Sequence, residues 1–266
     1  MAMTGSLART AIGRAVRAAL VLWFLVPLVP ILLWAFANRW PFPDLLPRQW
    51  GLDGVRSGFA AGAPHAFVVS AALGLAVAAI ATPAGALAAR ALSSGRLPLP
   101  RLIEAVLFAP LILPAFAVAL GLDVLVLRTR VPSPLAVVAV LSVAAIPYTT
   151  YLMRVAFGAY DQGFEDEART LGASRATVLF RVQIPLLAPA LSGAAFLAFL
   201  VGWTDYVVTL LIGGGRVVSV PILVASFAAG TGNSSVVAAL SLAAVIPPLI
   251  LLTVVARAGP RTGTST

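Results

Sequence analysis

Long uncharged apolar runs, divided by short polar segments, dominate the pattern of this chain. A helix needs about 20 mostly apolar residues to cross the hydrocarbon core of a bilayer. Six runs have this character and are predicted to be transmembrane helices: Ala18–Ala37, Ala66–Ala89, Ala105–Leu122, Val131–Met153, Val182–Thr204 and Val236–Ala256. A further apolar segment, Val217–Ala229, precedes a stretch rich in Gly and Asn and is expected to be partly buried before the last span. The pattern therefore predicts an all-α integral membrane protein.

The first run also has features of a secretory signal peptide. Arg14 and Arg17 precede it, and Ala35–Ala37 resembles a cleavage site. Its apolar stretch is longer than the core of about 7–15 residues that is usual in signal peptides, so we predict that it is retained as a span. The longest predicted outer loop, Asn38–Pro64, follows it. In this loop we expect a short helix lying on the membrane.

The positions of the basic residues predict the orientation, and all 18 of them are arginines. With a cytoplasmic N-terminus, twelve arginines fall in cytoplasmic segments and six outside. The positive-inside rule favours this N-in, C-in arrangement, although Arg128 and Arg130 locally favour the opposite one. The resulting organisation is a cytoplasmic tail 1–17, a six-helix domain 18–256 and a second tail 257–266. The predicted cytoplasmic arginines are Arg9, Arg14, Arg17, Arg90, Arg96, Arg101, Arg154, Arg169, Arg175, Arg181, Arg257 and Arg261.

Composition excludes most catalytic classes. Only 10% of the residues are charged, against about 25% in a soluble domain, which indicates lipid as the main solvent. The chain has no Cys, no Lys and a single His, His65. Thiolate metal sites, redox pairs, two-histidine metal motifs and a Lys-dependent phosphate loop are therefore excluded, and we expect no cofactor on this chain. The net charge of +9 does not indicate nucleic acid, because the arginines lie at the ends of apolar runs, where they mark topology and contact anionic lipid.

The most informative polar stretch is Gly158–Pro185, which lies on the predicted cytoplasmic side and holds four of the nine acidic residues. Its pattern predicts two short helices. Asp161 can cap the first, Gly172 suits the end of that helix because glycine adopts a positive φ without a Cβ clash, and Ser174 can cap the second. Pro185 is expected to break the helix before the fifth span.

The first of these helices has one apolar face, because Phe164, Ala168 and Leu171 recur at helical spacing. Two interpretations follow. Either this face docks a soluble partner protein, or the loop is amphipathic and packs on the chain's own helix ends. The residues by themselves leave both interpretations open.

At this loop the chain resembles the permeases of ATP-binding-cassette (ABC) importers. Their EAA loop has the pattern Glu-Ala-Ala, three residues, Gly, nine residues and Ile-x-Leu-Pro. Here Asp166-Glu167-Ala168 stands at the first triplet, Gly172 at the glycine and Val182-Gln183-Ile184-Pro185 at the ending, with all spacings kept. The departures are Asp for Glu, Glu for the first Ala, and the conservative Val182 and Ile184. The resemblance extends less specifically over residues 66–256.

The resemblance implies a type I importer bundle, in which two permease subunits form the pathway and two cytoplasmic ATPases, which bind ATP and Mg²⁺, power it. An extracytoplasmic binding protein would deliver the substrate, and the second permease is expected to be a related, non-identical chain. The location implied is the inner membrane of a bacterium. The last two spans are more similar to polyamine, iron(III), thiamine and phosphonate permeases than to sugar permeases. The ATPase-coupling residues implied are Phe164, Glu165, Asp166, Glu167, Ala168, Arg169, Leu171, Gly172, Ala173, Ser174, Val178 and Pro185.

Asp205 is the only charged residue between Arg181 and Arg216. A charge at the centre of a membrane helix costs about 2.5–3.5 kcal/mol, so such residues are kept for a reason. Asp205, with Trp203 and Tyr206, is a candidate for the translocation path or its outer gate. The alternative is a hydrogen-bonded structural role or an interfacial position.

Two rival functions belong to other classes. A secondary carrier driven by an ion gradient would use charged groups inside its spans, and apart from Asp205 the runs contain none. A membrane scaffold without a transport role is disfavoured by the EAA-like spacing.

Overall fold

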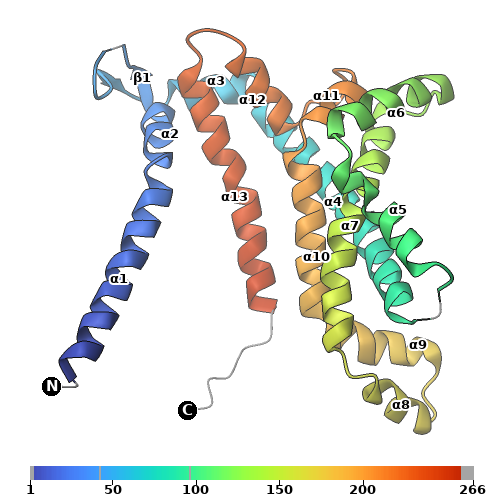
Figure 1. The fold of residues 1–266 in the computed structure, drawn as a ribbon. Helices are drawn as coiled ribbons and strands as arrows, with labels where there is room; N and C mark the ends of the chain where they lie inside the picture. Colours follow the sequence, from blue (N-terminus) through green and yellow to red (C-terminus); the bar gives the residue numbers. More distant parts are fainter. Residues whose placement is uncertain (1–2, 42, 96, 259–266) are drawn as a thin grey trace. The chain divides into compact units, whose positions relative to one another are not determined.

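The computed structural model of the protein describes residues 3–41, 43–95 and 97–258, in which regular structure is almost entirely helical (Figure 1). Arg96, Arg261 and positions 259–266 of the predicted C-terminal tail lie outside these residues. A two-stranded antiparallel ribbon is formed by β1 (Ala37–Arg39) and β2 (Gln49–Trp50), and a π-helical turn, η1 (Leu179–Gln183), leads into α10. The α-helices are α1 (Met3–Leu25), α2 (Leu28–Ala35), α3 (Asp53–Ala60), α4 (Ala63–Ser93), α5 (Pro100–Ile112), α6 (Ala115–Thr129), α7 (Ser133–Ala159), α8 (Gly163–Thr170), α9 (Arg175–Val178), α10 (Ile184–Thr204), α11 (Val207–Gly213), α12 (Val220–Ala228) and α13 (Ser234–Ala258).

The chain forms two compact units. Among the described residues, the first consists of those up to Ala63 together with Val224–Val245, and the second of those in Pro64–Leu223 and from Ile246 to Ala258. In the first unit, α3 packs on the start of α13 through glycine: a Cβ on Gly54 would lie 2.6 Å from the carbonyl oxygen of Ser235. α3 is the short helix predicted in Asn38–Pro64, its position on the membrane stays a prediction, and the β1–β2 ribbon is an addition to the all-α prediction.

In the second unit, α4, α7 and α10 pack closely through small residues. A Cβ on Gly202 of α10 would lie 2.8 Å from the Cα of Gly74 on α4, and a Cβ on Gly85 would lie 2.0 Å from the hydroxyl oxygen of Thr149 on α7. That hydroxyl donates to the carbonyl oxygen of Ala81 at 2.9 Å. Small residues let helix backbones approach in this way, and close packing with interhelical hydrogen bonds drives helix association in lipid.

Four helices among the described residues are long and apolar enough to cross a membrane: Ala63–Ser93, Ser133–Ala159, Arg175–Thr204 and Ser234–Arg257. Two bent pairs, α1 with α2 and α5 with α6, raise the number to as many as six if each pair is one span. The four unbroken helices correspond to the second, fourth, fifth and sixth predicted runs. Large apolar side chains are exposed along these helices, as expected of surfaces that face lipid or partner subunits.

The third predicted span, Ala105–Leu122, is not one continuous helix, and whether it crosses the membrane as a broken span stays a prediction. It is interrupted at Leu113–Pro114, where α5 and α6 meet at 99°. Pro114 has no amide hydrogen and disfavours a helical conformation in the residue before it, and Leu113 is accordingly extended, with ψ 134°. The first predicted span is bent by 47° between α1 and α2, and α1 already begins at Met3, inside the predicted tail 1–17.

Candidate functional site

The loop between α7 and α10 forms two short helices joined by a tight turn, as predicted. The end of α8 is a Schellman motif in which Gly172 has φ +84°. The N–H of Gly172 donates to the carbonyl oxygen of Arg169 at 2.9 Å, and that of Ala173 donates to the carbonyl oxygen of Ala168 at 3.0 Å. The position of Gly172 therefore requires the left-handed backbone that glycine adopts without steric cost.

Side chains predicted as caps satisfy backbone donors at both helix starts. The hydroxyl of Ser174 accepts from the N–H of Thr177 at 3.2 Å and caps α9. Asp161 lies one residue before the N-cap of α8, and its carboxylate accepts from the N–H of Gly163 at 2.8 Å. These bonds hold the two helices in place relative to the turn.

The predicted break at Pro185 is wrong. A single apolar helix runs from Arg175 to Thr204, with Pro185 in the first turn of α10. The π turn before it changes the hydrogen-bond register, since the N–H of Ile184 donates to the carbonyl oxygen of Leu179, five residues earlier. Such local π adjustments accommodate the missing donor of a proline in membrane helices.

The apolar side chains of the loop are divided between a buried and an exposed set. Val178 of α9 is only 2% exposed and packs into the second unit. Phe164 and Leu171 of the α8 region are 50% and 88% exposed, and Asp166 and Glu167 are exposed beside them. The apolar face of α8 is therefore not covered by the chain's own helix ends, which favours the docking interpretation over the packing one.

A polar cluster joins the loop to two long helices. Gln183, in the π turn, is 3% exposed. Its side-chain oxygen accepts from Nη1 of Arg90 at 2.7 Å, and its side-chain nitrogen donates to Oε1 of Glu165. Oε2 of Glu165 lies 3.8 Å from Nη2 of Arg90 and 3.5 Å from Nη2 of Arg169. We refer to Arg90, Glu165, Arg169 and Gln183 as the polar junction.

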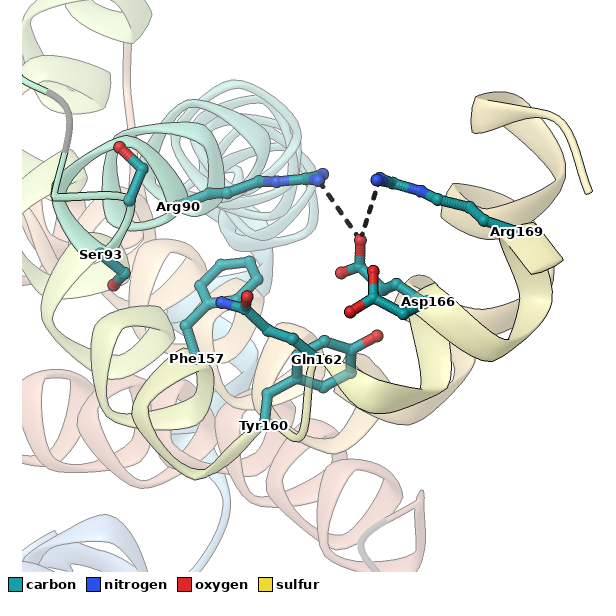
Figure 2. A pocket seen from close by; sticks show the side chains of 9 residues that line it. Arg90, Ser93, Phe157, Tyr160, Gln162, Asp166 and Arg169 are labelled. Atoms are coloured by element: carbon teal, nitrogen blue, oxygen red, sulfur yellow. Dashed lines mark ion pairs between the residues drawn. The ribbon is translucent and has the colours of Figure 1, made fainter.

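A pocket of about 290 Å³ opens beside the polar junction, lined by the ends of α4 and α7 and by α8 (Figure 2). In Figure 2, Arg90 from α4 and Arg169 from α8 point toward one another across it. Tyr160 follows α7 in the wall of this pocket. Burial, and then the negative charge of Glu165, raises the pKa of the Tyr160 hydroxyl above its usual value near 10. The hydroxyl is therefore neutral at physiological pH.

Two members of the polar junction, Arg90 and Gln183, were not among the predicted coupling residues. Gln183 is a polar residue near the start of the apolar run Val182–Thr204. A polar side chain inside an apolar run suggests a buried polar contact, and this signal could have identified Gln183 as a member of the site. Arg90 lies 93 positions before Gln183, and only the folded chain brings the two together.

The candidate gate residues meet at the corner between α10 and α11. The carboxylate of Asp205 accepts from the N–H of Thr209 at 2.8 Å and from its hydroxyl at 2.9 Å, so it caps the start of α11. Trp203 is 3% exposed and stacks on Phe199, with ring centroids 5.7 Å apart. Tyr206 is 40% exposed. The geometry favours a structural role for Asp205 and Trp203 over a role in the translocation path. Of the three candidate gate residues, Tyr206 has the exposed side chain.

Curated relatives of this chain are transport permeases. The molybdate/tungstate transport system permease protein WtpB of Pyrococcus abyssi is 26% identical over 111 residues, which cover 42% of this chain and 45% of WtpB. The inner membrane ABC transporter permease protein YnjC of Escherichia coli is 30% identical over 151 residues, which cover 56% of this chain and 29% of YnjC. The chain thus spans less than half the length of the curated relatives it matches.

The fold of the chain and its family were also found among known proteins. A solved bacterial ABC transporter, involved in the import of the acidic polysaccharide alginate, matches with a TM-score of 0.70 at 18% identity, covering 94% of this chain and 96% of the matched one. That likeness shows the fold. The family model described as binding-protein-dependent transport system inner membrane component matches residues 81–261, more than half of the chain. The chain therefore belongs to this family, the permeases of type I ABC importers.

Proposed function

We propose that this chain forms one half of the translocation pathway of an ABC importer and couples to a separate ATPase through the loop 158–185. The observation that carries the proposal is the uncovered face of α8, where Phe164 and Leu171 are exposed beside Asp166 and Glu167. An amphipathic helix of this kind is suited to docking in a groove of a partner protein. The turn at Gly172 sets the direction in which α8 presents that face.

Arginine distribution in the second unit supports a cytoplasmic position for this loop. The α4–α5 connection, α8 and α9 lie at one end of the unit, and the end of α6 and α11 lie at the other (Figure 1). More arginines belong to the first end than to the second, which favours the cytoplasm for the loop. With each bent helix pair counted as one span, this gives six spans with N-in, C-in topology. The described arginines are Arg90, Arg101, Arg154, Arg169, Arg175 and Arg181 at the loop end, and Arg128, Arg130 and Arg216 at the other.

The assembly proposed has four kinds of component in a bacterial inner membrane: this permease, a related but non-identical permease, ATPase subunits that hold ATP and Mg²⁺, and an extracytoplasmic substrate-binding protein. The absence of Lys from the sequence agrees with nucleotide binding on another subunit. The transporters that resemble this chain are named for cargo as different as molybdate and alginate. Similarity to these transporters therefore does not identify the substrate of this chain. We propose that the binding protein selects it.

Co-purification tests the proposal. The tagged chain would be expressed with the genes that neighbour its own and extracted in mild detergent, and the ATPase recovered per permease would be measured by quantitative mass spectrometry. In Gly172→Val, a β-branched residue would occupy a position with φ +84°, at a cost of at least about 1–2 kcal/mol, so we expect the turn to distort and ATPase recovery to fall.

The matched control is Gly158→Val, because Gly158 lies in α7 and a Cβ there meets nothing within 4 Å. It should retain normal recovery. Asp166→Ala should lower recovery without lowering the yield of the permease, since Asp166 is exposed. Equal ATPase recovery by wild type, Gly172→Val and Asp166→Ala would contradict docking through this loop.

A further inference from the structure

The polar junction ties α8 to two helices that are remote from it in sequence. Arg90 lies near the C-terminal end of α4, and Gln183 lies in the turn that enters α10. Each of Arg90, Gln183 and Glu165 contacts the other two: Arg90 donates to Gln183, Gln183 donates to Glu165, and Glu165 pairs with Arg90. The three side chains therefore form a closed polar triangle between α4, α8 and the start of α10.

Glu165 is the centre of this arrangement. Its side chain is 13% exposed, whereas the acidic partners in the other described ion pairs are 27% to 61% exposed. A carboxylate at this depth is stable only when it is paired, and here one oxygen lies between two guanidinium groups. Without Glu165, Arg90 and Arg169 would face each other across the pocket as like charges (Figure 2).

The π turn explains how Gln183 reaches the junction. Val178 and Gln183 are both buried, at 2% and 3% exposure, and are five residues apart. Residues on one face of an α-helix are three or four apart, whereas a π turn closes its hydrogen bond over five. The extra residue in η1 thus turns Gln183 to the same side as Val178, where Arg90 and Glu165 lie. Single π turns of this kind occur frequently at functional sites.

Adjacent acidic residues of α8 consequently have different environments. Glu165 faces the helices of its own unit, whereas Asp166 and Glu167 are exposed. Residues that are next to each other on a helix do not share a face. The apolar side of α8, with Phe164 and Leu171, is therefore separate from the side that Glu165 fixes to α4 and α10, whereas Asp166 also lines the pocket beside the polar junction.

We propose that Glu165 is a positioning residue that fixes α8 to the ends of α4 and α10, so that a displacement of α8 moves both helices as one body. This inference rests on the proposed function, because it takes an ATPase to be what displaces α8. The backbone joins α8 to α7 and α10, but its connection to α4 is made by side chains, through Arg90. Loss of the junction would leave the docking face intact and disconnect it from α4.

The first test neutralises the junction in the complete transporter. Complexes carrying Glu165→Gln or Arg90→Gln would be reconstituted in proteoliposomes with MgATP, with and without the binding protein. We expect ATPase recovery close to wild type but a loss of binding-protein stimulation of ATP hydrolysis of about tenfold, within the range of about 5- to 150-fold that is typical of coupling between sites. The matched control is Arg101→Gln, an exposed arginine at the start of α5, which should keep the stimulation.

The double variant distinguishes a joint action from two separate ones. If Arg90 and Glu165 act as a unit, combining Arg90→Gln with Glu165→Gln should lower stimulation no further than either change alone. Arg90→Lys should restore part of it, because an ammonium group keeps the charge opposite Glu165 but does not reproduce the fork of contacts to Glu165 and Gln183. Losses that multiply in the double variant would overturn the proposal.

A cross-link tests the rigid connection without disturbing any junction residue. The chain has no native Cys, so Ser93→Cys on α4 and Gln162→Cys just before α8 can be introduced at two positions that both line the pocket (Figure 2). If α4 and α8 move together, linking the two cysteines with a short bis-maleimide, which adds to one thiol at each end, should leave stimulated hydrolysis within about twofold of the unlinked protein, below the size of a typical coupling effect. Inactivation on cross-linking would show that α8 moves against α4 and would overturn the proposal.

The two proposals fail in different ways. A wild-type chain that recovers no ATPase contradicts the proposed function itself. A wild-type complex with stimulated hydrolysis, together with full stimulation in Glu165→Gln, refutes only the positioning role of Glu165.

Discussion

Asp205 illustrates how a single charged residue in an apolar environment can be held by local structure. Its carboxylate accepts from the N–H and from the hydroxyl of Thr209, at 2.8 and 2.9 Å. The carboxylate thus satisfies the start of α11, where backbone donors would otherwise lack partners. The free-energy cost of placing this charge in an apolar region is offset by the hydrogen bonds that the carboxylate accepts from the first turn of α11.

We therefore expect Asp205→Ala to lower the thermal stability of the purified protein, by about 0.5–2 kcal/mol, the range for the loss of a helix-capping side chain. Asp205→Asn keeps an acceptor oxygen and should retain most of the stability. Thermal unfolding in detergent, followed by the loss of monodisperse protein, measures both. If Asp205→Asn keeps full stability but loses stimulated ATP hydrolysis, the carboxylate has a role in the pathway and the structural interpretation is wrong.

Helix packing in the second unit depends on crossings where one residue has no side chain. At the α4–α7 crossing, a Cβ on Gly85 would lie 2.0 Å from the hydroxyl oxygen of Thr149 and 2.8 Å from the backbone nitrogen of Thr150. Because one of these atoms belongs to the backbone, rotation of a side chain cannot relieve the overlap. The helices themselves would have to separate.

Gly85→Ala should consequently destabilise the bundle by about 1–3 kcal/mol, the usual range for overpacking. The matched control is Gly121→Ala on α6, where a Cβ meets nothing within 4 Å. This control should be neutral or slightly stabilising, since Ala is favoured over Gly in helices by about 1 kcal/mol. Yield and thermal unfolding of the two variants give the comparison. Equal behaviour of both would mean that the α4–α7 crossing is looser than described.

At the scale of the whole molecule, the proposed orientation in the membrane rests on charge. The loop end of the second unit carries more arginines than the opposite end, and positively charged segments are retained in the cytoplasm. The uncovered face of α8 is useful for ATPase docking only on that side. The proposed docking of an ATPase at this loop therefore requires that the loop faces the cytoplasm.

Labelling of single cysteines tests this topology in a chain that has no cysteine of its own. Leu171→Cys, at a position 88% exposed, should react with a membrane-impermeant maleimide in inverted vesicles and not from outside the cell. Leu45→Cys, at a position 92% exposed in the predicted outer loop, should show the reverse. Labelling of Leu171→Cys from the outside would invert the topology and contradict ATPase docking at α8.

Local signals in the sequence predicted a large part of the loop. Gly172, Ser174 and the spacing of Phe164 and Leu171 each act within a few residues, so the turn, the cap of α9 and the apolar face of α8 were predictable. Pro185 was misjudged, because a π turn in a membrane helix can accommodate a proline that usually ends a helix. Arg90 could not be assigned to the loop at all, since its partners are remote in the chain.

The sequence by itself determined the solvent of this protein, the identity of its apolar runs and the family motif. These properties depend on composition and on short-range spacing, which need no knowledge of the fold. Only the tertiary structure decided that α5 and α6 are bent apart, that the face of α8 is uncovered and that Glu165 joins α4, α8 and α10. The physical reason is that burial and pairing of a polar side chain are set by residues distant in sequence, whereas helix periodicity and caps are set by neighbours.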